Sequence, residues 1–346
     1  HLIYFFLTYL TPIFVYLHTN LNMIESNLFV DKSLKISKEE ILQDYYLINE
    51  SRHLSLIGRK EVFMGRAKFG VFGDGKELPQ IAMSKFFNNG DFRSGYYRDQ
   101  TFMMAIDQLN ANQFFAQLYA HTDINFDPHS GGRQMNCHFG TRMLNSSGDW
   151  KTLTDMKNSA SDVSCVSGQM PRIVGLGYAS KLYRENKDLG QMQNFSINGN
   201  EVIFGTIGDA STSEGHFWES INACGVLQIP VVMSIWDDGY GISVPSEYHT
   251  TRNDLSKVLS GFQRSSKKEN GFELFTVKAW DYEGLLKAYS KAVKVAREDH
   301  VPSIIHVKDV TQPQGHTTSG SHERYKSKER LEWEKDFCCI KKIFCN

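Results

Sequence analysis

The stretch that decides the fold runs from Gly205 to Pro245 and reads GTIGDASTSEGHFWESINACGVLQIPVVMSIWDDGYGISVP. It contains two strand-like apolar segments, 201–207 and 230–236, separated by a segment with helical spacing. Asp209 follows the first apolar segment, and Asp238 follows the second about thirty residues later, which is the length of one strand–helix–strand unit. The stretch therefore predicts two neighbouring parallel strands, each with an acidic residue just beyond its carboxyl end.

The alternation of helix and strand extends on both sides of this stretch. Helical spacing is present at 37–65, 101–119, 169–185, 213–227 and 283–297, and further strand-like segments at 272–277 and 303–308. Residues 126–168 are rich in Asp, Gly, Ser and Asn, lack periodicity, and predict a long functional loop. The whole pattern predicts an α/β fold, a parallel sheet with helices on both faces.

Composition narrows the class of protein. The 346 residues are 41% apolar and 22% charged, as in ordinary soluble proteins, and the formal net charge is -1. A net charge this close to zero does not attract nucleic acid or an anionic membrane, so we expect neither as a partner. The six cysteines form no C-x-x-C pair, and their spacing is not that of a zinc site. We therefore expect reduced thiols in a cytoplasmic protein.

Both ends of the chain differ from the rest. An apolar, uncharged run at Leu2–Leu17 could be a signal peptide or anchor, but it lacks a basic n-region and a small-residue cleavage site. We therefore predict a native start at Met23, with 1–22 as a non-native upstream segment. The predicted domain is 23–330, and 331–346 is expected to be a truncated or altered tail.

The predicted geometry suits a metal–phosphate site. Ligands of parallel sheets bind beyond the carboxyl ends of the strands, where Asp209 and Asp238 would lie side by side. Two carboxylates and a backbone carbonyl can hold Mg²⁺, with phosphate oxygens completing its shell. A helix start capped by Ser211, Thr212 or Ser213 offers free N–H groups to a diphosphate. The sequence therefore predicts a magnesium–diphosphate site.

The stretch resembles the thiamine diphosphate motif, which opens with Gly-Asp-Gly and closes with Asn-Asn. It resembles more closely the alpha-subunit motif of the 2-oxo acid dehydrogenases, and the similarity extends over about residues 40–330. The resemblance implies the thiamine diphosphate-binding fold, with Mg²⁺ on Asp209, Asp238 and the carbonyl of Tyr240. It also implies that the diphosphate is held by consecutive residues, Gly208, Asp209, Ala210 and Ser211.

The stretch departs from the motif in three respects. Ala210 stands where Gly is preferred, Asp237-Asp238 replaces Asn-Asn, and Trp236 stands where branched-chain relatives carry a phosphate-binding Arg. The second change adds negative charge beside a diphosphate. The one literal Gly-Asp-Gly, at 73–75, is followed too soon by Asn-Asn for a crossover helix, and we interpret it as a turn.

Other segments extend the resemblance. Tyr97 and Arg98 match a pair that contacts the diphosphate, and an Arg can bind phosphate bidentately. Ser164 and Val166 match a cofactor-contacting Ser and an apolar residue under the hinge between the two cofactor rings. Taken alone, these segments would be a surface turn and a helix cap with a core valine.

Two segments bear on the substrate. Gly132-Arg133-Gln134-Met135, followed by His138, resembles a segment of the branched-chain enzymes and favours branched-chain substrates. His316 lies where the family has a Gly-His-Ser loop whose His acts near the substrate carboxylate and in acyl transfer; His322 is a weaker candidate. The remaining histidines, His249 among them, show no paired spacing and are assigned no role.

The resemblance implies decarboxylation of a small 2-oxo acid on thiamine diphosphate, followed by reductive acylation of lipoamide. It implies two partners, a lipoyl-bearing dihydrolipoyl acyltransferase and a beta-type subunit or fused C-terminal half that supplies an activating Glu. The alternatives are a pyruvate or acetoin dehydrogenase alpha subunit, a transketolase-like enzyme, and a non-catalytic subunit that binds cofactor or partner only.

Overall fold

The computed structural model describes residues 36–318 and 320–343. The predicted upstream segment, 1–22, lies outside the described residues. Within the described part of the chain, no helix is both long and apolar enough to cross a membrane.

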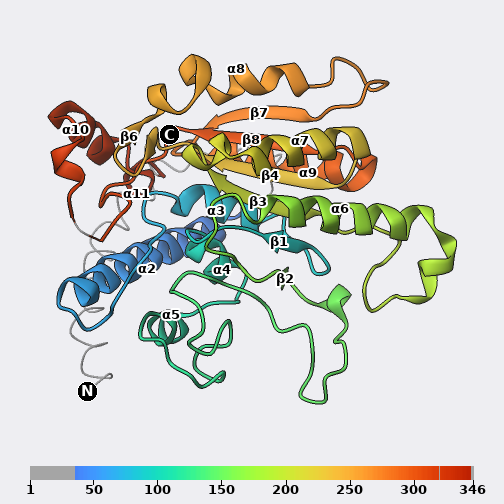
Figure 1. Cartoon of the computed structure of the whole chain (residues 1–346), viewed down its shortest axis with the longest axis horizontal. Coiled ribbons are helices and arrows are strands. Elements are labelled where there is room, and N and C mark those ends of the chain that lie inside the picture. The colour runs from blue at the N-terminus through green and yellow to red at the C-terminus, as the bar shows by residue number, and fades with distance from the viewer. Residues whose placement is uncertain (1–35, 319, 344–346) are drawn as a thin grey trace.

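A six-stranded sheet forms the centre of the fold, with strand order β2-β1-β3-β4-β8-β7 and parallel pairing throughout. In Figure 1 this order runs from β2 at the bottom to β7 at the top. The strands are β1 (Phe92–Ser94), β2 (Asn158–Ser159), β3 (Ile203–Gly208), β4 (Val231–Trp236), β7 (Glu273–Lys278) and β8 (Ser303–Lys308). A separate hairpin follows β4 and consists of β5 (Tyr240–Gly241) and β6 (Val244–Pro245). The predicted parallel α/β architecture is confirmed.

Helices cover the sheet on both faces. They are α2 (Lys38–Phe63), α3 (Glu77–Ser84), α4 (Gln100–Ala105), α5 (Ala111–Leu118), α6 (Met170–Glu185), α7 (Gly215–Leu227), α8 (Leu255–Leu259), α9 (Tyr282–Asp299), α10 (Lys328–Asp336) and α11 (Cys339–Lys342). The single helix predicted at 101–119 is wrong: α4 and α5 are separate, and Asp107 between them has a left-handed backbone that no helix accepts.

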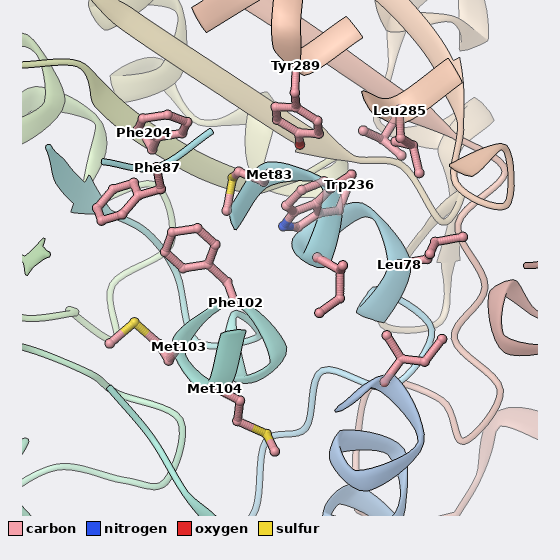
Figure 2. Packing of buried hydrophobic residues seen from close by; sticks show 14 of the residues in the cluster. Leu78, Met83, Phe87, Phe102, Met103, Met104, Phe204, Trp236, Leu285 and Tyr289 are labelled. Atoms are coloured by element: carbon pink, nitrogen blue, oxygen red, sulfur yellow. The ribbon is translucent and has the colours of Figure 1, made fainter. Parts of the chain in front are cut away.

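Strand β4 shows how the two faces are built. Successive side chains of a strand point to opposite faces, so Val231, Met233 and Ile235 join the core under α6, α7 and α8. Val232 and Trp236 join the other core, under α3 and α9. Figure 2 shows the Trp236 indole among side chains of that second core, and the residue is fully buried. Trp236 therefore serves packing rather than phosphate binding.

The described part of the predicted tail is packed on this domain. Helix α11 contacts α2 and α3, and both Cys339 and Ile343 are buried. The prediction that the tail is altered stays a prediction.

The Gly-Asp-Gly segment at 73–75 forms the predicted turn and leads directly into α3. Gly75 has a φ of +94°, and a Cβ at this position would lie 1.7 Å from the carbonyl oxygen of Thr311. Only glycine therefore lets this turn approach the chain after β8. Gly148 also has a positive φ, +87°, but no atom of the described residues lies within 4 Å of the point that a Cβ would occupy there.

Gly75 and Gly148 give a matched test of whether the fold needs the close contact between the Gly75 turn and the backbone of Thr311. We expect Gly148→Ala to lower the free energy of unfolding by about 1–2 kcal/mol, the usual penalty for a left-handed backbone. Gly75→Ala adds a clash with the backbone, so we expect a loss of at least about 3 kcal/mol, measured by urea unfolding. Equal losses in the two variants would show that the turn does not depend on this approach.

Candidate functional site

A pocket of about 590 Å³ lies at the carboxyl ends of β3 and β4. The structure brings to its walls every residue that the sequence predicted to contact cofactor or metal, namely Tyr97, Arg98, Ser164, Val166, Gly208, Asp209, Ala210, Ser211, Asp238, Tyr240 and His316. These residues come from five separate parts of the chain. Their individual roles stay predictions.

The register of the two strands places the acidic residues together. Gly208 pairs with Trp236, so Asp209 and Asp238 both lie just beyond this last pair. The N–H of Asp209 donates to the carbonyl of Trp236 at 3.1 Å, which fixes the point where the chain leaves the sheet. Two carboxylates thus enter one pocket from neighbouring strands.

Asp209 is a buried acid that lies among other acids. Its Oδ2 has no hydrogen-bond partner among the described residues. Burial, together with the charges of Asp238 and Asp237, raises the pKa of Asp209 well above its usual value. His249, to which the sequence assigned no role, places Nε2 3.9 Å from that oxygen, and this nitrogen likewise has no hydrogen-bond partner in the described part of the chain. A cation beside Asp209 would relieve this accumulation of negative charge.

Asp238 has the opposite environment. Its Oδ2 accepts from Nζ of Lys76 at 3.0 Å and contacts Nε2 of His316 at 3.1 Å, while Oδ1 accepts from the N–H of Tyr240. Burial acts to raise the pKa of Asp238, but His316 and Lys76 outweigh it and hold this pKa well below the usual value. The sequence did not identify Lys76, because nothing local connects residue 76 to the end of β4.

The predicted helix cap is wrong. A short 3₁₀ turn, Ala210–Ser213, comes first, and α7 begins after Glu214, whose side chain makes no capping hydrogen bond. Two of the three hydroxyls expected to cap the helix have other partners, since Thr212 donates to the carbonyl of Asp209 and Ser213 to a loop carbonyl. The pocket therefore faces this turn rather than a capped helix start.

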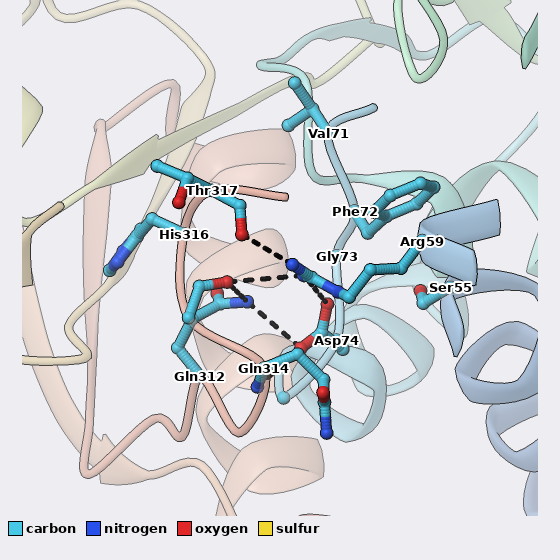
Figure 3. Close-up of polar contacts among 12 residues, drawn as sticks. Ser55, Arg59, Val71, Phe72, Gly73, Asp74, Gln312, Gln314, His316 and Thr317 are labelled. Carbon is cyan, nitrogen blue, oxygen red and sulfur yellow. Dashed lines mark hydrogen bonds and ion pairs between the residues drawn. The ribbon is translucent and has the colours of Figure 1, made fainter. Parts of the chain in front are cut away.

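A polar network of Arg59, Asp74 and Gln312 contacts the loop that carries His316 (Figure 3). Arg59 donates to the carbonyl of Thr317 at 2.6 Å and pairs with Asp74 at 3.5 Å. Asp74 also accepts from the side chain of Gln312 at 3.2 Å. The Gly-Asp-Gly turn is thus no cofactor motif, but its Asp positions the His316 loop.

Arg98 supports the same loop. Its guanidinium donates to the carbonyls of Phe72 and His316, the latter at 2.9 Å. The side chain lines the pocket, yet two of its nitrogens already bind backbone. A bidentate contact with phosphate would require these bonds to be shared or exchanged.

The opposite wall carries the branched-chain-like segment. His138 contacts the hydroxyl of Ser164 at 2.9 Å and stacks on the ring of Tyr97 with centroids 5.8 Å apart. Met135 and His138 both line the pocket, and Val166 is 45% exposed at its wall. Segments predicted separately therefore form one surface.

A residue from α10 completes the loop after β4. Arg330 donates to the backbone carbonyl of Asp238 at 2.7 Å, and its guanidinium lies 5.5 Å from the centre of the Tyr240 ring. No pattern in the sequence indicates this contact, which joins positions about ninety residues apart.

Comparison with known proteins agrees with this geometry. The model of the family described as "Dehydrogenase E1 component" matches residues 52–343. The chain is 25% identical over 270 residues to 2-oxoisovalerate dehydrogenase subunit alpha of Bacillus subtilis, covering 78% of this chain and 69% of that protein. It is 24% identical over 302 residues to the mitochondrial human protein of that name, covering 87% of this chain and 58% of the relative. It is 25% identical over 326 residues to the mitochondrial 2-oxoisovalerate dehydrogenase subunit alpha 2 of Arabidopsis thaliana, covering 93% of this chain and 59% of the relative. The chain thus spans less than two thirds of the length of most of these relatives. The chain belongs to the dehydrogenase E1 component family.

Proposed function

We propose that the chain is the alpha-type half of a thiamine diphosphate-dependent 2-oxo acid dehydrogenase. The observation that carries the proposal is the meeting of Asp209 and Asp238 in one pocket, where Oδ2 of Asp209 finds no partner among the described residues. A cation would stabilise a carboxylate buried in this way, and Mg²⁺ prefers such oxygen ligands. We infer that Mg²⁺ binds Asp209, Asp238 and the carbonyl of Tyr240.

The proposed metal shell relies on more than side chains. Among residues 36–318 and 320–343, no three His, Cys, Asp or Glu side chains gather as a metal site. The Tyr240 carbonyl and the phosphate oxygens must therefore supply the remaining ligands. In this proposal the segment from Gly208 to Ser211, with Tyr97 and Arg98, holds the diphosphate, while Ser164 and Val166 support the cofactor rings. When bound, thiamine diphosphate supplies the carbanion chemistry of decarboxylation.

His316 is the proposed group for the substrate. It is buried beside Asp238, and burial lowers its pKa although the carboxylate acts to raise it. Its Nδ1 has no hydrogen-bond partner among the described residues. A neutral imidazole with such a ring nitrogen can accept or hold a proton near the substrate.

The substrate we propose is a branched-chain 2-oxo acid such as 3-methyl-2-oxobutanoate. Phe69, Val71 and Met135 give part of the pocket an apolar wall, which suits an aliphatic side chain. The names of the relatives support the same substrate class.

The proposal includes partners. Phe69, Val166 and Ile242 line the pocket and are 50%, 45% and 56% exposed, so water reaches a site whose chemistry requires exclusion of water. A beta-type subunit or fused half would cover it and supply the activating Glu, and a lipoyl-bearing acyltransferase would take the acyl group. We propose a cytoplasmic location for the assembly.

The first test is cofactor binding. We expect calorimetry on the chain co-expressed with its beta-type partner to show thiamine diphosphate binding that requires Mg²⁺ and disappears in EDTA. Asp209→Ala removes a metal ligand and should weaken binding at least about tenfold, which is about 1.4 kcal/mol. The exposed Asp188→Ala is the matched control. Undiminished binding in Asp209→Ala would remove Asp209 from the site, and no binding by the wild type would favour a non-catalytic subunit.

The second test separates binding from chemistry. His316→Asn should lower kcat/KM for the 2-oxo acid by about 10²-fold or more, as loss of a proton-transfer group does. Cofactor affinity should fall much less than kcat/KM, because His316 is not a proposed metal ligand and Lys76 still contacts Asp238 in this variant. His322→Asn, in the neighbouring turn, should leave both values near those of the wild type. A loss of cofactor binding equal to the loss of activity would argue against this assignment.

The third test concerns the substrate. We expect kcat/KM to be higher for 3-methyl-2-oxobutanoate than for pyruvate, because the apolar wall binds the larger side chain. Met135→Ala should reduce this preference, by about 1–3 kcal/mol at most for lost apolar contact. A preference for pyruvate or acetoin would support the related alpha-subunit function instead. Activity without lipoamide would indicate a transketolase-like enzyme.

A further inference from the structure

We propose that Lys76 is a positioning residue, a buried counter-cation that offsets the charge of Asp238 so that this aspartate can serve in a metal–diphosphate site. The inference rests on the proposed function. It adds a residue that neither the motif nor the comparisons identify.

The contacts of Lys76 are specific. Its Nζ lies 3.0 Å from Oδ2 of Asp238 and 2.6 Å from Oε1 of Gln312, and its side chain is 1% exposed. An ammonium group is buried this completely only when it is paired. The Gln312 amide accepts one hydrogen bond and the carboxylate supplies the counter-charge, so the pair is held in one geometry.

The ammonium group of Lys76 reaches Asp238 from the protein side rather than from the pocket. Asp238, Asp209 and Tyr240 line the pocket, whereas Lys76 does not. The ammonium therefore does not occupy the space beside Asp209 that a metal would fill. It offsets the charge of the carboxylate from the protein side, while the pocket-lining His316 contacts the same oxygen.

The other acidic groups near Lys76 have partners of their own. Glu77, the next residue, forms a double hydrogen bond with Arg52. Asp74, two residues earlier, pairs with Arg59. Neither acid offsets Lys76, which leaves Asp238 as its counter-ion.

The neighbouring Asp237 has a separate partner. Its carboxylate contacts Nε2 of the buried His306 at 2.8 Å, and Nδ1 of this imidazole lies 2.6 Å from the hydroxyl of Ser256. Asp237 thus contacts His306, whereas Asp238 contacts Lys76 and the pocket-lining His316. Of these two aspartates only Asp238 lines the pocket, and it is the one that Lys76 contacts.

A count of charges shows why Lys76 matters. Mg²⁺ with the single carboxylate of Asp209 leaves one net positive charge to attract a diphosphate. An ionised Asp238 would cancel that charge, and Lys76 restores it. Because the groups are buried, solvent screens the difference only weakly.

The test is a charge-restoration experiment on the chain co-expressed with its beta-type partner. Lys76→Met keeps most of the volume but removes the cation, and we expect the Kd for thiamine diphosphate in saturating Mg²⁺ to rise at least tenfold by calorimetry. Adding Asp238→Asn to this variant removes the charge that Lys76 no longer offsets, while the isosteric amide keeps an oxygen that can ligate Mg²⁺. We expect the Kd to return to within about threefold of the wild-type value. The exposed Lys294→Met is the control and should bind as the wild type does.

The outcomes separate the two proposals. No binding by the wild type would overturn the proposed function, and this inference with it. Wild-type binding that is unchanged in Lys76→Met would overturn the role of Lys76 alone. A double variant as weak as Lys76→Met, with the circular dichroism of the wild type, would also overturn it, because a merely structural lysine is not rescued by removing a charge.

Discussion

The parallel pairing of β3 with β4 is the constraint on which the site depends. The last pair of this register, Gly208 with Trp236, sets where both chains leave the sheet and brings Asp209 and Asp238 into one pocket. A shift of one residue would reverse the faces of β4, moving Trp236 out of its core and the loop after it out of the pocket. The same six residues of each strand therefore determine both the packing of the sheet and the geometry of the site.

Bringing carboxylates together opposes folding, and the surrounding chain shows how this is offset. Asp238 has Lys76 and His316, Asp237 has His306, and Asp209 keeps one oxygen that no described residue hydrogen-bonds. Asp237 and Asp238 thus each have a basic side chain in hydrogen-bond contact, and a bound cation would give Asp209 a partner as well. Such residual destabilisation is typical of functional sites, where stability is given up for binding.

The sequence alone predicted the parallel sheet, the positions of its main strands and the convergence of the motif residues on one pocket. These follow from periodicity and from rules on strand ends, which are local. It missed Lys76 and Arg330 because their contacts with Asp238 depend on how distant segments pack, and no local pattern encodes that. The cap at 211–213 was predicted from residue type, but the hydroxyls of Thr212 and Ser213 found carbonyl acceptors instead. Propensity yields to the partners that the tertiary structure offers.

The departures from the motif are connected through charge. Trp236 packs in the core on the α3 side, so this position, where the family resemblance predicts a phosphate-binding Arg, contributes no cation to the pocket. An aspartate at 238 makes the same region more negative still. Two cationic side chains from elsewhere in the fold contact Asp238. Lys76 at the start of α3 contacts its carboxylate, and Arg330 on α10 contacts its backbone carbonyl. A substitution in this motif is therefore best judged by the charges within a few ångströms of it, since the residue letter alone would count these departures as damage.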